Sequence, residues 1–486
     1  SGPVTLELID SLYTSPANET GFLLNGPIPG VNPNSRVTIR PATNKNVRFQ
    51  GNGKYIVTFQ NTSFLNFDGV STETGTSLTF YSQYNSAFDR NRAVNFSGNS
   101  DHNIIQNLTC IGEDIYRYGD LIVIGPTNAS SVPDSNLIQN NFIKQGGGSI
   151  TVGGLSTSYR ARGNIVRNNK IGSETDSLIS WGIHLEWCQN SLVENNIVQN
   201  LKVTTTYGSD ILIPGINCYG GLEDTIRNNV VHNIRSSSGY TSTGILLSGS
   251  SNSQGNRNII YNNMVYVIQS TSTSTNNRVA GIQMWYQSNP KVYYNSVYLS
   301  GTGQNKYGSA ALYISISCTN VEVKNNVLAN TRDESPYCAS SIYTIVNLTS
   351  DNNDLYYEPN QYSCLVRIGS TKYNTLSDWQ AEGKDLLSVT EMPKFIKPDL
   401  HIDESIPTNL EKRAVLIAGI DIDIDGDPRN TDLPDIGADE FTGNVVPGPL
   451  MSGYSVGVKG YFPTIDSVFN RLSTDGISGP VTLELI

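Results

Sequence analysis

His184 and Glu186 are the residues whose types and spacing best suit general acid and base catalysis. They stand in GIHLEW (182–187), where they alternate with Ile183 and Leu185. In a strand, successive side chains point to opposite faces, so His184 and Glu186 would share one outward face. An imidazole and a carboxylate placed together could exchange protons with a substrate. A solvated sheet face would carry the same residues, and we favour this non-catalytic interpretation because no second carboxylate accompanies the pair.

Aromatic and amide side chains occupy matching outward positions on other segments. Gln283 and Trp285 lie in GIQMWY (281–286), and Tyr313 lies in ALYISI (311–316). Rings of this kind can stack on sugars, so the three residues form a candidate glycan-binding set. They could equally pack against a neighbouring unit, and the sequence leaves both interpretations open.

Carboxylates near the end of the chain have the spacing of a calcium loop. Asp421, Asp423 and Asp425 alternate along the chain, Gly426 follows, and Asp432 takes the twelfth position, where Glu is usual. Calcium is therefore the one cofactor that the sequence suggests. The alternative is a last strand whose aspartates face water.

The six cysteines show no Cys-x-x-Cys spacing, which removes the usual zinc pattern. Cys218 stands in an apolar position of its segment, as a core residue would. Cys338 and Cys364 are 26 residues apart, close to the internal repeat length, and could face each other as a disulfide.

Two segment types recur about every thirty residues and must position these candidates. One contains an Asn corner between two short apolar stretches. Examples are NLIQNNFI (136–143), NIVRNNKI (164–171), SLVENNIV (191–198), DTIRNNVV (224–231), NIIYNNMV (258–265), KVYYNSVY (291–298) and NVEVKNNVL (320–328). The other is a short apolar segment such as GIHLEW, GIQMWY and ALYISI. Two strand motifs repeating in phase predict an all-β fold of stacked coils, a β-solenoid.

Asparagine explains both the corners and the low charge. The chain contains 53 Asn, whereas only 15% of its residues are charged. Asn tolerates left-handed backbone, and its amide can bond the equivalent Asn one coil away, at a strand spacing of about 4.8 Å. A charge repeated at a stacked corner would repel itself. The expected ladder residues are Asn140, Asn168, Asn195, Asn228, Asn262, Asn295 and Asn325.

The first nine residues, SGPVTLELI, recur unchanged as residues 478–486. We interpret this as a tandem array with a period of 477 residues; an artificial duplication is the alternative. Ile465, Val468, Phe469 and Leu472 have helical spacing, so 464–472 is expected to be a helix that closes the end of a β-helix. The expected domains are the coils and C-terminal cap segment (1–441), a linker between units (442–452) and the start of the next unit (453–486).

Composition excludes some partners. The net charge of −11 argues against nucleic acid, which requires a basic face. No apolar run of about 18 residues could span a bilayer.

The coil pattern resembles the pectate-lyase-like group of right-handed parallel β-helices. Three segments are more specifically similar to long secreted β-helix repeat proteins of the Bacteroidetes and Ignavibacteria type. They are GYSVGVKGYFPTIDSVFNRLSTDGISGPVTLELI (453–486) continued by DSLYTS (10–15), NTLSDWQAEGKDLLSV…DLHI (374–402) and DIDGDPRNTDLPDIGADEF (423–441). This resemblance implies an extracellular or cell-surface protein. The chain lacks the Asp-Asp, Gly-His-Gly and Arg-Ile-Lys motifs of pectinolytic relatives.

We therefore expect a non-enzymatic structural unit of an extracellular fibre or surface appendage, whose partners are other copies of the same unit. An adhesin that binds glycans is the first alternative. A polysaccharide lyase or hydrolase is the second.

Overall fold

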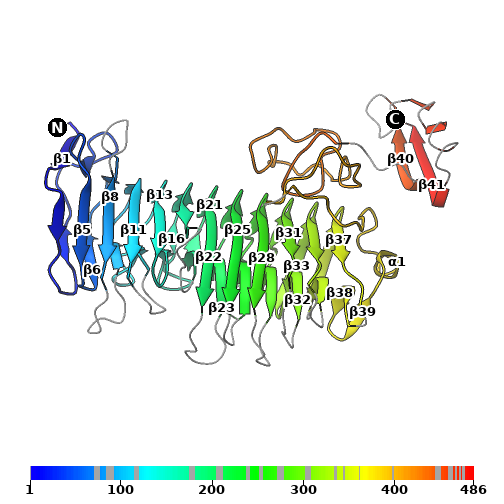
Figure 1. The fold of residues 1–486 in the computed structure, drawn as a ribbon, viewed down its shortest axis with the longest axis horizontal. Coiled ribbons are helices and arrows are strands. Elements are labelled where there is room, and N and C mark those ends of the chain that lie inside the picture. Colours follow the sequence, from blue (N-terminus) through cyan, green and yellow to red (C-terminus); the bar gives the residue numbers. More distant parts are fainter. Residues whose placement is uncertain are drawn as a thin grey trace.

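The chain winds into a long solenoid of short strands (Figure 1). The computed structural model describes residues 2–70, 77–83, 92–113, 120–173, 181–203, 212–236, 241–250, 255–270, 278–301, 308–332, 337–342, 345–360, 362–396, 399–443, 450–457, 464–465, 468–469, 472 and 477–485.

Three sheets form the sides of the solenoid. Sheet A contains β1 (Val4–Leu8), β4 (Val37–Pro41), β7 (Leu65–Asp68), β10 (Ile104–Gln106), β13 (Leu137–Gln139), β17 (Ile165–Arg167), β21 (Leu192–Glu194), β24 (Thr225–Arg227), β27 (Ile259–Tyr261), β30 (Lys291–Tyr293), β33 (Cys318–Lys324) and β36 (Ile345–Asp351). Sheet B contains β2 (Leu12–Thr14), β5 (Val47–Gly51), β8 (Leu78–Ser82), β11 (Leu108–Gly112), β14 (Phe142–Gln145), β18 (Lys170–Ile171), β22 (Ile197–Val203), β25 (Val230–Ser236), β28 (Met264–Ser270), β31 (Ser296–Leu299), β34 (Val327–Asn330) and β37 (Asp354–Tyr357).

Sheet C contains β3 (Phe22–Asn25), β6 (Tyr55–Gln60), β9 (Arg92–Ser97), β12 (Ile122–Gly125), β15 (Ile150–Gly153), β19 (Ile183–Glu186), β23 (Leu212–Tyr219), β26 (Thr241–Ser248), β29 (Val279–Met284), β32 (Ser309–Ile314), β35 (Tyr337–Ile342), β38 (Cys364–Ile368) and β39 (Thr371–Tyr373). Only β39 is antiparallel, to β38, among the described strands of these sheets. Two short strands, β16 (Ala161–Arg162) and β20 (Cys188–Gln189), pair at one bend. The parallel β-helix predicted from the sequence is confirmed.

The strand register places similar residues of successive coils above one another along the axis. In sheet A, Val166 lies opposite Val193, and Val193 lies opposite Ile226 in the next coil. All three side chains are buried in one core that runs through the solenoid. Because the side chains alternate, the neighbouring positions of the same strands face outward.

Asparagine makes the corner between sheets A and B, as expected. Asn140, Asn168, Asn195, Asn228, Asn262 and Asn325 have φ between 52° and 61°. In the coil of KVYYNSVY, Tyr294 adopts this conformation instead, with φ of 50°. The corner residue there is therefore Tyr294, one position before the expected Asn295.

The amide ladder lies one residue further along the chain than predicted. The amide of Asn196 donates to Asn229, and that of Asn229 donates to Asn263, both at 3.0 Å. The ladder comprises Asn141, Asn169, Asn196, Asn229, Asn263, Asn295, Asn326 and Asn353. Of the seven predicted residues, only Asn295 belongs to it. A left-handed residue turns its own side chain out of the corner, so the buried ladder falls to the following residue.

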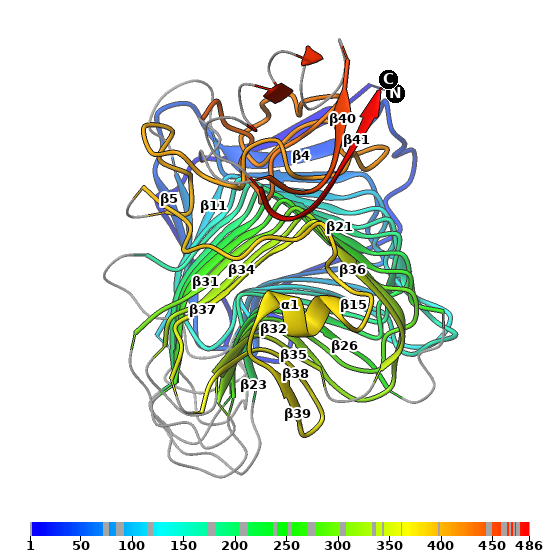
Figure 2. The same cartoon turned by 90° about the vertical axis from the view of Figure 1, so that its right-hand side faces the viewer.

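The helix α1 (Leu376–Gln380) lies across the C-terminal end of the core (Figure 2). Thr375 and Asp378 form a capping box, and Trp379 is buried against the last coils. The carboxylate of Asp385 accepts hydrogen bonds from the Asn353 amide at 2.9 Å and from the Trp379 indole at 2.6 Å. The buried carboxylate of Asp385 thus accepts the hydrogen bond that the last Asn of the ladder would otherwise have no Asn to receive.

An irregular segment, residues 390–443, packs back on the Asn corner. Asn228, Asn262 and Asn325 direct their amides to backbone carbonyls of residues 423, 422 and 415, at 3.0, 2.7 and 2.7 Å. Three predicted ladder residues therefore hold this segment instead.

The C-terminal end forms a small separate core. β40 (Leu450–Val456) pairs in parallel with β41 (Ile477–Leu485). Within the expected helix 464–472, residues 465, 468, 469 and 472 are helical, and the intervening ones lie outside the described residues, as do linker residues 444–449. The expected linker 442–452 overlaps β40. No helix in the described part of the chain is long and apolar enough to cross a membrane.

Candidate functional site

His184 and Glu186 both face outward on β19, as the alternation predicted. Their Nε2 and Oε2 atoms are 3.9 Å apart. The amide of Asn217 contacts His184 Nδ1 at 2.9 Å, and the Trp181 ring lies 5.0 Å from the imidazole. The His184 imidazole is thus positioned by the Asn217 amide and by contact with the Trp181 ring.

The expected glycan-binding residues are covered by protein. Gln283 and Tyr313 are adjacent in sheet C and buried, while Trp285 is half-buried. Gln283 accepts a hydrogen bond from Thr243, and the Arg278 guanidinium lies 3.6 Å from the centre of the Tyr313 ring. A sugar could reach this ring face only by displacing Arg278.

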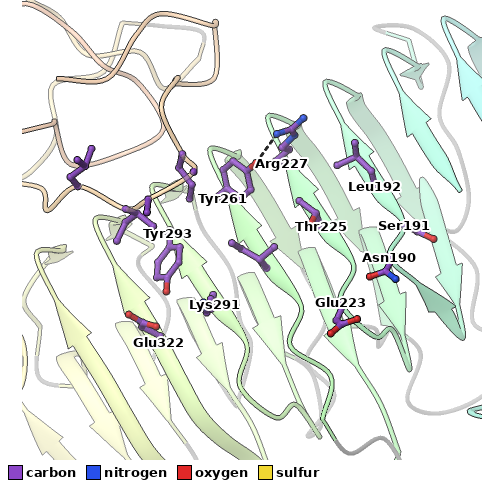
Figure 3. A pocket seen from close by; sticks show the side chains of 16 residues that line it. Asn190, Ser191, Leu192, Glu223, Thr225, Arg227, Tyr261, Lys291, Tyr293 and Glu322 are labelled. Carbon is purple, nitrogen blue, oxygen red and sulfur yellow. Dashed lines mark hydrogen bonds between the residues drawn. The ribbon is translucent and has the colours of Figure 1, made fainter. Parts of the chain in front are cut away.

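A groove of about 770 Å³ runs over the outer face of sheet A (Figure 3). Its floor is a row of residues that lie in register on successive strands: Leu192, Thr225, Ile259, Lys291 and Glu322. Residues 416–420 of the C-terminal segment form the opposite wall, and Leu416 is exposed there. The floor is mostly apolar at Leu192 and Ile259 and charged at Lys291 and Glu322.

Hydrogen bonds between neighbouring coils organise the polar side of the groove. Arg227 donates to Glu194 at 2.6 Å and to the Tyr261 hydroxyl at 2.7 Å. Burial alone would lower the pKa of Arg227, but these bonds raise it. Burial and a hydrogen bond with Glu322 raise the pKa of Tyr293, so its phenol stays protonated. The groove holds hydrogen-bond donors and acceptors in fixed positions, and its side chains include both positive and negative charges. It therefore suits a polar, uncharged ligand.

This groove is not among the sites expected from the sequence. Its polar side includes Arg227, Tyr261 and Tyr293, which form one column of residues immediately before successive corners. Aligning the corner motifs would have shown this column. The wall 416–420 has no comparable signal, because it comes from a segment without a repeat.

The four carboxylates of the expected calcium loop are used differently. One oxygen of Asp423 accepts backbone N–H groups from residues 425, 426 and 427, and the other accepts from Glu440. Asp425 instead contacts His401 Nε2 at 2.7 Å, while Asp421 and Asp432 are exposed. Among the described residues, the group that could hold an ion is His401, Asp425 and Asp439, rather than the predicted four.

Cys338 and Cys364 lie opposite each other on β35 and β38, with Sγ atoms 2.7 Å apart. A hydrogen bond to Cys364 and burial raise the pKa of Cys338, and the same hydrogen bond lowers the pKa of Cys364. The disulfide between them stays a prediction.

The repeated nonapeptide occupies equivalent strands. Residues 4–8 form β1, the first strand of sheet A, and their copies 481–485 form most of β41. Val4 and Leu6 are each 51% exposed. Their copies Val481 and Leu483 are half-buried and pack in a small core with Tyr454, Val456, Val468 and Leu472.

Sheets, corners and ladder together define the class: the chain is a parallel β-helix protein. No protein-family model matches the chain, and no curated sequence matches it. Among solved structures it is similar to the periplasmic alginate epimerase AlgG, at 12% identity over 74% of this chain and 77% of that one, with a TM-score of 0.42.

Two further structures share this likeness. PfbA, a surface adhesin of Streptococcus pneumoniae, is 11% identical over 75% of this chain and 85% of its own, with a TM-score of 0.34. The PL6 family alginate lyase AlyGC is 12% identical over 93% and 62% of the two chains, with a TM-score of 0.28. Identities this low concern the fold alone.

Proposed function

We propose that the chain is a non-enzymatic structural unit of a tandem-repeat filament or appendage at the cell surface of a bacterium. The observation that carries this proposal is the repeated nonapeptide, whose two copies occupy the same kind of strand. A first strand that recurs after a complete solenoid is what a chain of successive solenoids would contain. Its partners would be further copies of the same unit.

The build of the solenoid suits this role. Backbone hydrogen bonds between coils run along the axis, and the buried Asn ladder runs beside them. Sheets of 12 strands at a spacing of about 4.8 Å give a rod roughly 6 nm long. Low charge allows such stacking without repulsion between coils.

Electron microscopy of the native material tests the proposal. We expect filaments or appendages with an axial repeat of at least about 6 nm, the length of one solenoid. Dispersed single solenoids in native surface extracts would contradict a structural array. Turnover of an acidic polysaccharide, lost in His184→Ala, would contradict the non-enzymatic assignment.

A second candidate function is saccharide binding in the sheet A groove. The groove combines an apolar patch at Ile259 and Leu416 with fixed polar groups, and the two faces of a sugar ring differ in the same way. Lys291→Ala should weaken binding on a glycan array. The matched control is Lys170→Ala, on sheet B outside the groove. Equal signals from both variants would argue against this site.

A further inference from the structure

The N-terminal end of the solenoid exposes part of its own core. Val4 and Leu6 point to the inside of sheet A, since they lie opposite Val37 and Ile39, which pack against the core. Half of each side chain is nevertheless exposed. At the other end, α1 covers the last coils. The two ends of the solenoid are therefore closed to different degrees.

Among the strands that the structure describes, only β4 pairs with β1, so the other edge of β1 has no strand beside it. The amide of Val4 donates to Arg36, and the carbonyl of Leu8 accepts from Ala42, so these residues face β4. Backbone groups alternate between the two edges of a strand, which directs Thr5 and Glu7 away from β4. Edge groups of this kind readily pair with an added strand.

The C-terminal copy of β1 shows what fits there. β40 lies parallel to β41, with Tyr454 opposite Leu483 and Val456 opposite Leu485. Val468, which is fully buried, and Leu472 pack in the same small core as Val481 and Leu483. Val481 and Leu483 are therefore more covered than Val4 and Leu6, whereas Leu485 is 75% exposed and its counterpart Leu8 is half-buried.

We infer that the first coil is completed by a copy of residues 450–472 from the preceding unit. β40 of that unit would add to β1 in parallel, placing Tyr454 opposite Leu6 and Val456 opposite Leu8. Its helix would cover Val4 and Leu6 as it covers their copies. Each solenoid would then be built from two successive sequence repeats. This inference rests on the proposed tandem array.

The test compares the 486-residue chain with one extended at its start by a copy of residues 450–477. Hydrogen exchange is followed by mass spectrometry in the segment from Val4 to Tyr13, whose mass differs from that of the C-terminal copy. We expect the amides of Thr5 and Glu7, which point away from β4, to exchange at least about a hundredfold more slowly in the extended chain, because open strand edges exchange almost freely.

Two variants of the added copy sharpen the test. Val468→Asp places a charge at the buried helix position and should abolish the protection. Thr464→Asp adds the same charge at an exposed position and should retain it. Unchanged exchange in the extended chain would overturn the inference, as would a dimer of the unextended chain joined through β1. Protection without native filaments would instead refute the array and leave the cap standing.

Discussion

At the residue scale, the two residues of an Asn-Asn corner have different structural roles. The first adopts the left-handed conformation that most side chains avoid, and the second is buried with its amide bonded in both directions. Asn195 and Asn196 illustrate the division, since the former is exposed and the latter fully buried.

Asn229→Ala should destabilise the solenoid by about 2 kcal/mol, because it removes the buried oxygen that accepts from the backbone N–H and the amide of Asn196, and the amide that donates to Asn263. Chemical denaturation followed by circular dichroism measures this loss. Asn195→Gly is the control: it keeps the left-handed corner and removes only an exposed amide, so the expected change is below about 0.5 kcal/mol. Equal losses in both variants would argue against a structural ladder.

Cys338 and Cys364 give a second prediction at this scale. Under oxidising conditions we expect them to form a disulfide, which would leave four of the six cysteines titratable after denaturation. Cys338→Ser should leave five. Six reactive thiols in protein purified without reductant would refute the pairing.

At the element scale, the coils were predictable and the C-terminal segment was not. Asn-Asn corners and alternating apolar residues repeat, so each coil reinforces the pattern of the next. Residues 390–443 have no sequence repeat. Their position depends on individual contacts that do not recur from coil to coil, such as the hydrogen bond of Asn262 to residue 422. The groove wall at 416–420 follows from that docking, whereas the contact of Asp425 with His401 lies within the segment itself. Asp423 of the calcium-like spacing accepts backbone N–H groups from residues 425, 426, 427 and 440, and calcium binding at these carboxylates stays a prediction.

The C-terminal segment should lose stability as the pH rises. Burial raises the pKa of Asp435 from 3.8 to about 8, so the folded segment keeps a proton that the unfolded chain releases. Burial lowers the pKa of His401, but bonds to Asp399 and Asp425 raise it from 6.5 to about 9. Both stabilising contributions are present at low pH and are lost as the pH rises through these folded-state values.

Calorimetry at pH 6 and pH 9 checks this expectation. The unfolding midpoint should fall between the two, and His401→Gln should reduce the fall. The same substitution at His184, which lies on sheet C, should not. A midpoint that rises with pH would mean that these two groups do not govern the segment.

At the scale of the whole molecule, the connection between units decides whether filaments form. Deleting residues 444–449 keeps β40 and the contacts of Thr442 with Glu404 and Gly443 with Glu411. We expect each unit to remain folded, with unchanged circular dichroism, while filaments become short or absent. Replacing the six residues with a Gly-Ser sequence of equal length should preserve filaments. Filaments unaffected by the deletion would show that the units associate without this connection.

The direction of the hydrogen bonds between coils has a mechanical consequence. A pull on the two ends of the solenoid loads these bonds one coil at a time, as in opening a zipper, rather than all together in shear. Each coil of about thirty residues would release roughly 100 Å of chain. Optical tweezers should record a low plateau of force that begins once an end coil is detached. The yield force would then depend on Trp379 and Asp385 at one end and on the covering of β1 at the other.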